Sequence, residues 1–100
     1  MSAEQNKQTL RRFYEDVWHA EEPAYDQYLA PEAAGYRQQI EELKAENPDI
    51  HFDLGEIVAE GGTVVAVWTT PAMAGVEGIS IWHFKDGKIT DRTAYTRELG

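Results

Sequence analysis

The sequence predicts an α+β domain in which three N-terminal helices precede a four-stranded antiparallel sheet. Apolar residues recur at helical spacing as far as residue 46, and after Pro48 they alternate with polar residues as in strands. Four strand-like segments follow, separated by short turns rich in glycine and proline. Connections this short make consecutive strands antiparallel neighbours. We therefore expect a single domain over residues 1–100, with every helix before the sheet.

The first helix is expected to begin after Ser2, because Ser2 and Gln5 have the spacing of a capping box. It ends at the Glu-Glu-Pro of residues 21–23, since proline disfavours helical geometry in the preceding residue. Pro23 can also open a short second helix. A third helix over residues 32–46 ends before an Asn-Pro pair. The apolar face of the first helix consists of Leu10, Phe13, Tyr14, Val17 and Trp18.

Turn and bulge residues divide the second half of the chain. The apolar residues stand at alternate positions before and after Gly55 but one residue out of step, which indicates a β-bulge there. Gly61 and Gly62 can supply the left-handed conformations of a tight turn, and Asp86 with Gly87 is typical of a type I′ hairpin turn. The predicted strands span residues 50–59, 63–70, 76–84 and 88–96.

Composition and charge exclude several classes of function. A formal charge of -9, from 18 acidic and 9 basic residues, repels the phosphate backbone of nucleic acid. No apolar run approaches the roughly 18 residues of a membrane span, and the first twelve residues lack the apolar segment of a signal peptide. The absence of cysteine removes disulfides and thiolate chemistry. We therefore expect a cytoplasmic protein that binds neither nucleic acid nor membranes.

Metal and cofactor motifs are missing from the sequence. His19, His51 and His83 are scattered, without the HxH or HxxxH spacing that brings ligands together at a metal. The Gly61-Gly62 pair lies between strands and opens no helix, so it does not form a phosphate-binding loop. We expect neither a metal nor a cofactor.

The second and third predicted strands are apolar on both faces. A sheet covered on one side alternates apolar and polar residues. Three short helices can cover one face, so we expect a second copy of the chain to cover the other, in a homodimer. Alternatively, twist and edge contacts could bury these residues within a monomer. The expected interface residues are Val65, Val67, Ile79, Ile81 and His83.

Three segments carry a family resemblance: RRFYEDVW at 11–18, LAPE at 29–32 and WHFKDGKI at 82–89. Their order and spacing resemble the SnoaL-like polyketide cyclases of the nuclear transport factor two-like superfamily, over nearly the whole chain. The resemblance implies a cone-shaped α+β fold in which helices close over a curved sheet and leave a pocket at the wide end. It also implies homodimers packed sheet to sheet. Because this fold hosts cyclases, isomerases, hydrolases and binding modules, it does not by itself define the function.

The sequence departs from the cyclase pattern at the proton-transfer groups of the family. The resemblance implies an aspartate, acting as general acid/base, where this chain has Ala94, and a histidine where it has Ser80. Many relatives read His-Trp where this chain has Arg-Thr at 92–93. Segments 32–35 and 70–75 are also shorter than in typical relatives, so we expect a reduced member with a shallow pocket.

Aromatic residues are the main candidates for lining a pocket, although they could also form a plain core. Arg92 shares the parity of Ala94 and can point inward, which would favour an anionic or carbonyl ligand. The alternative for Arg92 is a salt bridge at the sheet edge. The predicted ligand-pocket residues are Tyr14, Trp18, Tyr36, Trp68, Thr70, Ser80, Trp82 and Arg92.

The sequence is compatible with three functional hypotheses. The first is a homodimeric domain that binds a small apolar or mildly polar molecule without performing the cyclase reaction. The second is an isomerase, lyase or hydrolase acting on a small apolar or polyketide-like substrate through a relocated group. Asp53 is the carboxylate to test as its base, against the alternative of a solvated strand residue. The third is an interaction or stability module whose cavity is filled by its own side chains.

Overall fold

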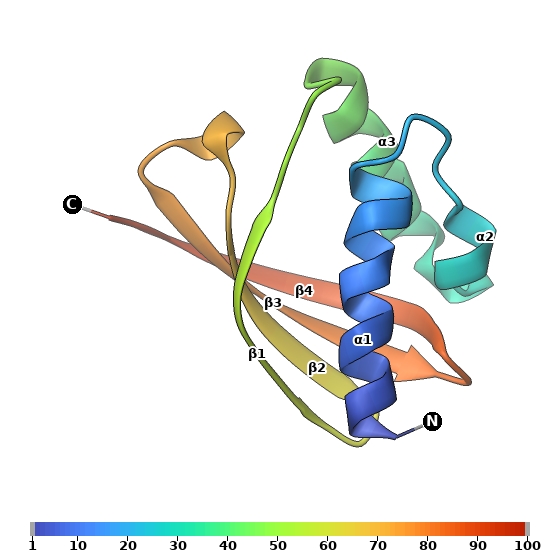
Figure 1. Cartoon of the computed structure of the whole chain (residues 1–100). Coiled ribbons are helices and arrows are strands. Elements are labelled where there is room, and N and C mark those ends of the chain that lie inside the picture. Colours follow the sequence, from blue (N-terminus) through green and yellow to red (C-terminus); the bar gives the residue numbers. More distant parts are fainter. Residues whose placement is uncertain (1, 100) are drawn as a thin grey trace.

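A computed structural model describes residues 2–99, and its helices precede one antiparallel sheet as predicted (Figure 1). The helical elements are α1 (Ala3–Phe13), the π-helical turn η1 (Tyr14–Trp18), α2 (Tyr25–Tyr28), the 3₁₀ turn η2 (Pro31–Ala33) and α3 (Ala34–Glu46). The strands are β1 (Asp53–Glu60), β2 (Thr63–Thr69), β3 (Val76–Lys85) and β4 (Lys88–Glu98), with the 3₁₀ turn η3 (Pro71–Met73) between β2 and β3. Within the described range they pair in the order β1-β2-β3-β4.

The predicted capping box begins α1. Ser2 Oγ accepts the Gln5 N–H at 3.1 Å, and Gln5 Oε1 accepts the Ser2 N–H at 2.9 Å. The last turn differs from the uninterrupted helix that the sequence predicts, because the His19 N–H donates to the Tyr14 carbonyl five residues back, at 2.9 Å. This wider turn still buries Tyr14, Val17 and Trp18.

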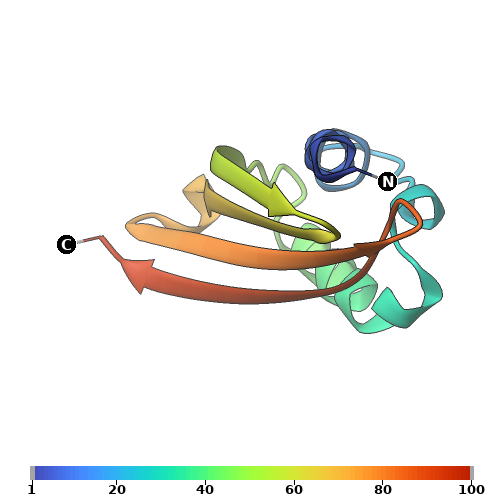
Figure 2. The ribbon, with the colours of Figure 1, turned by 90° about the horizontal axis from the view of Figure 1, so that it is seen from below.

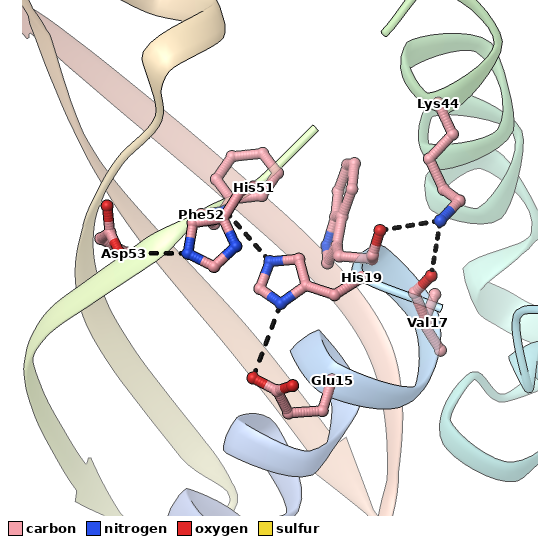
Figure 3. Close-up of polar contacts among 8 residues, drawn as sticks. Glu15, Val17, His19, Lys44, His51, Phe52 and Asp53 are labelled. Atoms are coloured by element: carbon pink, nitrogen blue, oxygen red, sulfur yellow. Dashed lines mark hydrogen bonds and ion pairs between the residues drawn. The ribbon is translucent and has the colours of Figure 1, made fainter. Parts of the chain in front are cut away.

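A lysine of α3 holds the end of this first helical segment (Figure 3). Lys44 Nζ donates to the carbonyls of Val17, Trp18 and Ala20 at 3.0, 2.7 and 2.9 Å. These carbonyls lie where a helix runs out of backbone donors, and a positive charge there also suits the helix dipole. Lys44 therefore joins α3 to the element that carries Trp18.

The predicted bulge lies in β1. Leu54 pairs with Trp68 and Ile57 pairs with Ala66, so two residues of β1 oppose one residue of β2. The shift returns Ile57 to the buried side of the sheet.

The two hairpin turns are close to their predictions, with one correction. Asp86 and Gly87 both have positive φ, 52° and 80°, as a type I′ turn requires. Gly61 is also left-handed, with φ 56°, but Gly62 is not. Gly62 is instead required because the backbone of β3 lies too close for a side chain: a Cβ there would lie 2.6 Å from the Phe84 carbonyl oxygen.

The helices lie on one side of the twisted sheet, and β3 and β4 extend beyond them toward the C-terminal end (Figures 1 and 2). The inner face is buried, while on the outer face Ile79 is 41% exposed and Tyr95 63% exposed. Within the described residues, no helix is both long and apolar enough to cross a membrane. The inner face of β2 and β3 consists of Val64, Ala66, Trp68, Ser80 and Trp82.

Candidate functional site

A cavity of about 370 Å³ lies between α3, the end of the first helical segment and the inner face of the sheet. Leu43 and Met73 line it and are themselves partly exposed, so they mark its opening beside η3. The predicted pocket residues that line it are Tyr14, Trp18, Tyr36, Trp68, Ser80 and Arg92.

Two residues predicted for the pocket are buried but do not line this cavity. Trp82 is fully buried, and its indole N–H donates to the Tyr36 hydroxyl at 3.2 Å, so it lies behind the wall and supports it. Thr70 is also buried, and its Oγ1 has no hydrogen-bond partner. Asp53 is exposed, hydrogen-bonds to His51 Nε2 at 3.2 Å and does not line the cavity.

Phe52 is the central wall residue that the sequence interpretation left out. Its ring meets those of Tyr14, Trp18 and Trp68 edge-on, at centroid distances of 5.5, 4.7 and 5.4 Å. Edge-to-face contacts at such distances are favourable for aromatic pairs. Its alternation with the polar His51 and Asp53 is the sequence signal that could have found it, but only the fold places it beside the first helical segment.

A glycine in β3 allows Trp68 to lie across the floor of the cavity. Trp68 pairs with Gly78 in the ladder, and a Cβ on Gly78 would lie 2.1 Å from the indole carbon Cζ2. In this position the indole N–H donates to Ser80 Oγ at 2.8 Å. Both polar atoms are thereby satisfied within the sheet.

Tyr36 is the centre of a group of hydrogen-bond donors on the wall. Burial raises the pKa of the Tyr36 hydroxyl, while the Arg92 charge and the nearby donors of Trp82 and Trp18 lower it. The Arg92 guanidinium lies over the ring, with Cζ 4.5 Å from the centroid. Within residues 2–99 Arg92 makes no ion pair, so the salt bridge considered from the sequence does not form.

The adjacent Tyr14 hydroxyl is equally enclosed. Burial, together with the neighbouring Tyr36, raises the pKa of Tyr14 well above its ordinary value, although the Arg92 charge acts in the opposite direction. Both phenols are therefore protonated at neutral pH. Among the described residues that line the cavity there is no aspartate, glutamate or histidine, and Ala94 lies on its wall.

The fold brings together two histidines that are scattered in the sequence (Figure 3). His19 and His51 stack with ring centroids 4.5 Å apart, and His19 Nε2 accepts the Phe52 N–H at 3.0 Å. Burial and the charge of His51 lower the pKa of His19, while Glu15, 3.6 Å from His19 Nδ1, raises it. Within the described residues no group of His, Cys, Asp and Glu could hold a metal ion.

His83, predicted for the outer face, lies there with its Nδ1 2.5 Å from Asp91 Oδ1. Both side chains are largely exposed. The pair is therefore remote from the cavity, on the other side of the sheet.

A family model described as a SnoaL-like domain matches residues 2–92. Among solved structures, a candidate polyketide cyclase from Acidithiobacillus ferrooxidans is 25% identical, with TM-score 0.73 over 95% of this chain and 89% of that chain. A candidate polyketide cyclase from Streptomyces antibioticus is 15% identical, with TM-score 0.75 over 92% of this chain and 91% of that chain. A candidate hydroxylase from Streptomyces galilaeus is 15% identical, with TM-score 0.74 over 96% of this chain and 77% of that chain.

The two Streptomyces structures, at such low identity, show a likeness of fold alone. No curated protein matches the sequence significantly.

Proposed function

The chain belongs to the SnoaL-like domain family, and from this premise we propose that it binds a small, largely apolar molecule in the aromatic cavity. The observation that carries the proposal is the cavity itself, about 370 Å³ with a wall dominated by aromatic rings. Ligand pockets typically measure roughly 300–1,000 Å³ and combine apolar walls with few polar groups. Tyr36, Ser80 and Arg92 supply the polar groups here.

Binding in this proposal does not include the cyclase reaction. General acid/base catalysis needs a carboxyl or imidazole group within reach of the transferred proton. Ala94 and Ser80 stand where the family resemblance implies an aspartate and a histidine, and no aspartate, glutamate or histidine lines the cavity. Similar structures are described as cyclases and as a hydroxylase, so the fold is compatible with more than one activity.

The hypothesis that the chain is an enzyme is narrowed by the position of its candidate base. Asp53 as a base receives no support from its exposed position beside His51. An isomerase, lyase or hydrolase in this cavity would instead depend on polar groups arranged in advance around the substrate, such as Ser80 and Arg92. A pH–rate profile without an essential carboxylate would distinguish it from a chain with a relocated acid.

The binding proposal is tested by filling the cavity. Ala94→Leu adds bulk to its wall, and Thr93→Leu makes a matched change on the outer face of the same strand. We expect the neutral fluorophore N-phenyl-1-naphthylamine to bind the wild type and the Thr93 variant alike, and the Ala94 variant ~10-fold or more weakly. Equal binding to the wild type and to the Ala94 variant would contradict the cavity as the site.

We also propose that two copies of the chain pair through the outer face of the sheet. The partly exposed apolar side chains there support this, since exposed apolar patches commonly mark interfaces. Ile81→Asp should give monomers by light scattering, while Gln38→Glu adds the same charge on the exposed surface of α3 and should leave the assembly unchanged. A dimer that persists in Ile81→Asp would disprove this arrangement. The proposed interface residues are Val65, Val67, Ile79, Ile81 and His83.

A cytoplasmic location remains a prediction from the sequence.

A further inference from the structure

In the described part of the chain, the hydroxyl proton of Tyr36 is not used in a hydrogen bond. A phenol oxygen has two lone pairs and one hydrogen. Its oxygen accepts the Trp82 N–H at 3.2 Å, and the Trp18 and Arg92 donors lie close enough to favour its ionised form. Within the described residues the Tyr36 hydroxyl donates to no protein acceptor. Because burial keeps the group protonated, its hydrogen is available to an acceptor in the cavity.

Trp18 directs a second donor toward the Tyr36 oxygen, and this contact acts to lower the pKa of the Tyr36 hydroxyl. Its side chain is 3% exposed, and within residues 2–99 its indole Nε1 makes no hydrogen bond of ordinary geometry. An indole N–H can only donate. Because this N–H is enclosed and lies near the Tyr36 oxygen, it supports the Tyr36 hydroxyl and does not itself face a ligand.

Arg92 adds the positive charge. Its guanidinium has five N–H donors. The hydrogen bond that it donates to Gln39 Oε1 is long, at 3.4 Å. Two other arginines of the described chain form ion pairs with carboxylates, Arg37 with Asp26 at 3.0 Å and Arg97 with Glu77 at 2.8 Å, whereas Arg11 and Arg12 on α1 form none. In a chain with a net charge of -9, an arginine on the cavity wall without a carboxylate is a site for an external anion.

From the free proton of Tyr36 and the charge of Arg92, and given the proposed binding function, we propose that the ligand is a flat aromatic anion, a carboxylate or phenolate, whose charged oxygen lies at Tyr36 and Arg92. The rings would occupy the part of the cavity walled by Phe52 and Trp68. Every polar group at the charged end donates, so an acceptor-only oxygen fits it better than an amide, which presents donors as well. Hydrogen bonds to a charged oxygen are also stronger than neutral ones.

The test compares 2-naphthoate with 2-naphthamide, two probes with the same rings and different polar ends. Titration calorimetry at neutral pH should show 2-naphthoate binding ~10-fold or more tightly to the wild type. Arg92→Gln should abolish this preference, and Tyr36→Phe should reduce it. Arg97→Gln, which removes an arginine from the outer face of the same strand, should keep the full preference.

The outcomes separate this inference from the function on which it rests. If both probes bind with equal affinity, or 2-naphthamide binds more tightly, the anion inference is overturned and the apolar cavity remains a binding site. If neither these probes nor the neutral fluorophore binds, the proposed function is overturned as well. A preference that survives in Arg92→Gln, folded by circular dichroism, would disprove the role of Arg92.

Discussion

Replacing Gly78 with alanine should close the cavity from its floor. A Cβ at this position would lie 2.1, 2.2 and 2.6 Å from three atoms of the Trp68 indole. Ordinary contact begins at 3.4 Å, so the nearest ring atom must move by 3.4 − 2.1 = 1.3 Å. Backbone lies on one side of the ring and open cavity on the other, so we expect the indole to move into the cavity.

The energetic cost of Gly78→Ala follows from that displacement. Loss of the hydrogen bond between Trp68 Nε1 and Ser80 Oγ, which is 2.8 Å long, costs about 0.5–1.5 kcal/mol. Crowding in a packed core adds roughly 1–3 kcal/mol. The reduced backbone freedom of the unfolded chain returns about 0.4–1 kcal/mol. The free energy of unfolding should therefore fall by roughly 0.5–4 kcal/mol.

Urea denaturation followed by tryptophan fluorescence measures the stability change, and titration with N-phenyl-1-naphthylamine measures the loss of the cavity. Gly35→Ala in α3 is the matched control, because nothing lies within 4 Å of its added Cβ. It should raise the free energy of unfolding by about 0.5–1 kcal/mol through helix propensity. A Gly78→Ala variant with unchanged stability and unchanged probe binding would refute the account of Trp68.

Two further predictions concern the elements around the cavity. Neutral His19 accepts the Phe52 N–H, and its pKa in the folded state lies below the ordinary 6.5. The contribution of His19 to stability is therefore complete above pH 6.5, and it is lost as the pH falls through the lowered pKa of the folded state. In urea denaturation the wild type should therefore lose stability more steeply than His19→Gln below pH 6.5, and parallel curves would contradict this. Lys44→Met removes three hydrogen bonds to carbonyls and should cost about 1.5–3 kcal/mol. The ion pair of the half-buried Lys7 with the exposed Glu4 provides the comparison, since Lys7→Met should change the free energy of unfolding by less than about 1 kcal/mol. Equal costs for the two lysines would disprove the capping role of Lys44.

Residue patterns within short stretches of the sequence were sufficient to predict the order of the helices and strands and the alternation of side chains along each strand. The capping box at Ser2, the bulge after Gly55 and the turn at Asp86 each depend on residues a few positions apart, and each is present as predicted. Strand alternation grouped Arg92 with Ala94, and the family resemblance assigned Ser80 to the pocket; both residues line the cavity. A period of two assigns a side chain to one face of a sheet wherever the sheet is packed.

The contacts that shape the site depend on residues far apart in the chain. The stacking of His19 on His51, the position of Phe52 among the aromatic rings and the support of Tyr36 by Trp82 all join separate elements. No local spacing encodes such pairs, because they depend on how helices dock on a twisted sheet. The sequence by itself therefore determined which residues face inward, and the tertiary structure decided which of them surround a cavity and which donors there lack a partner.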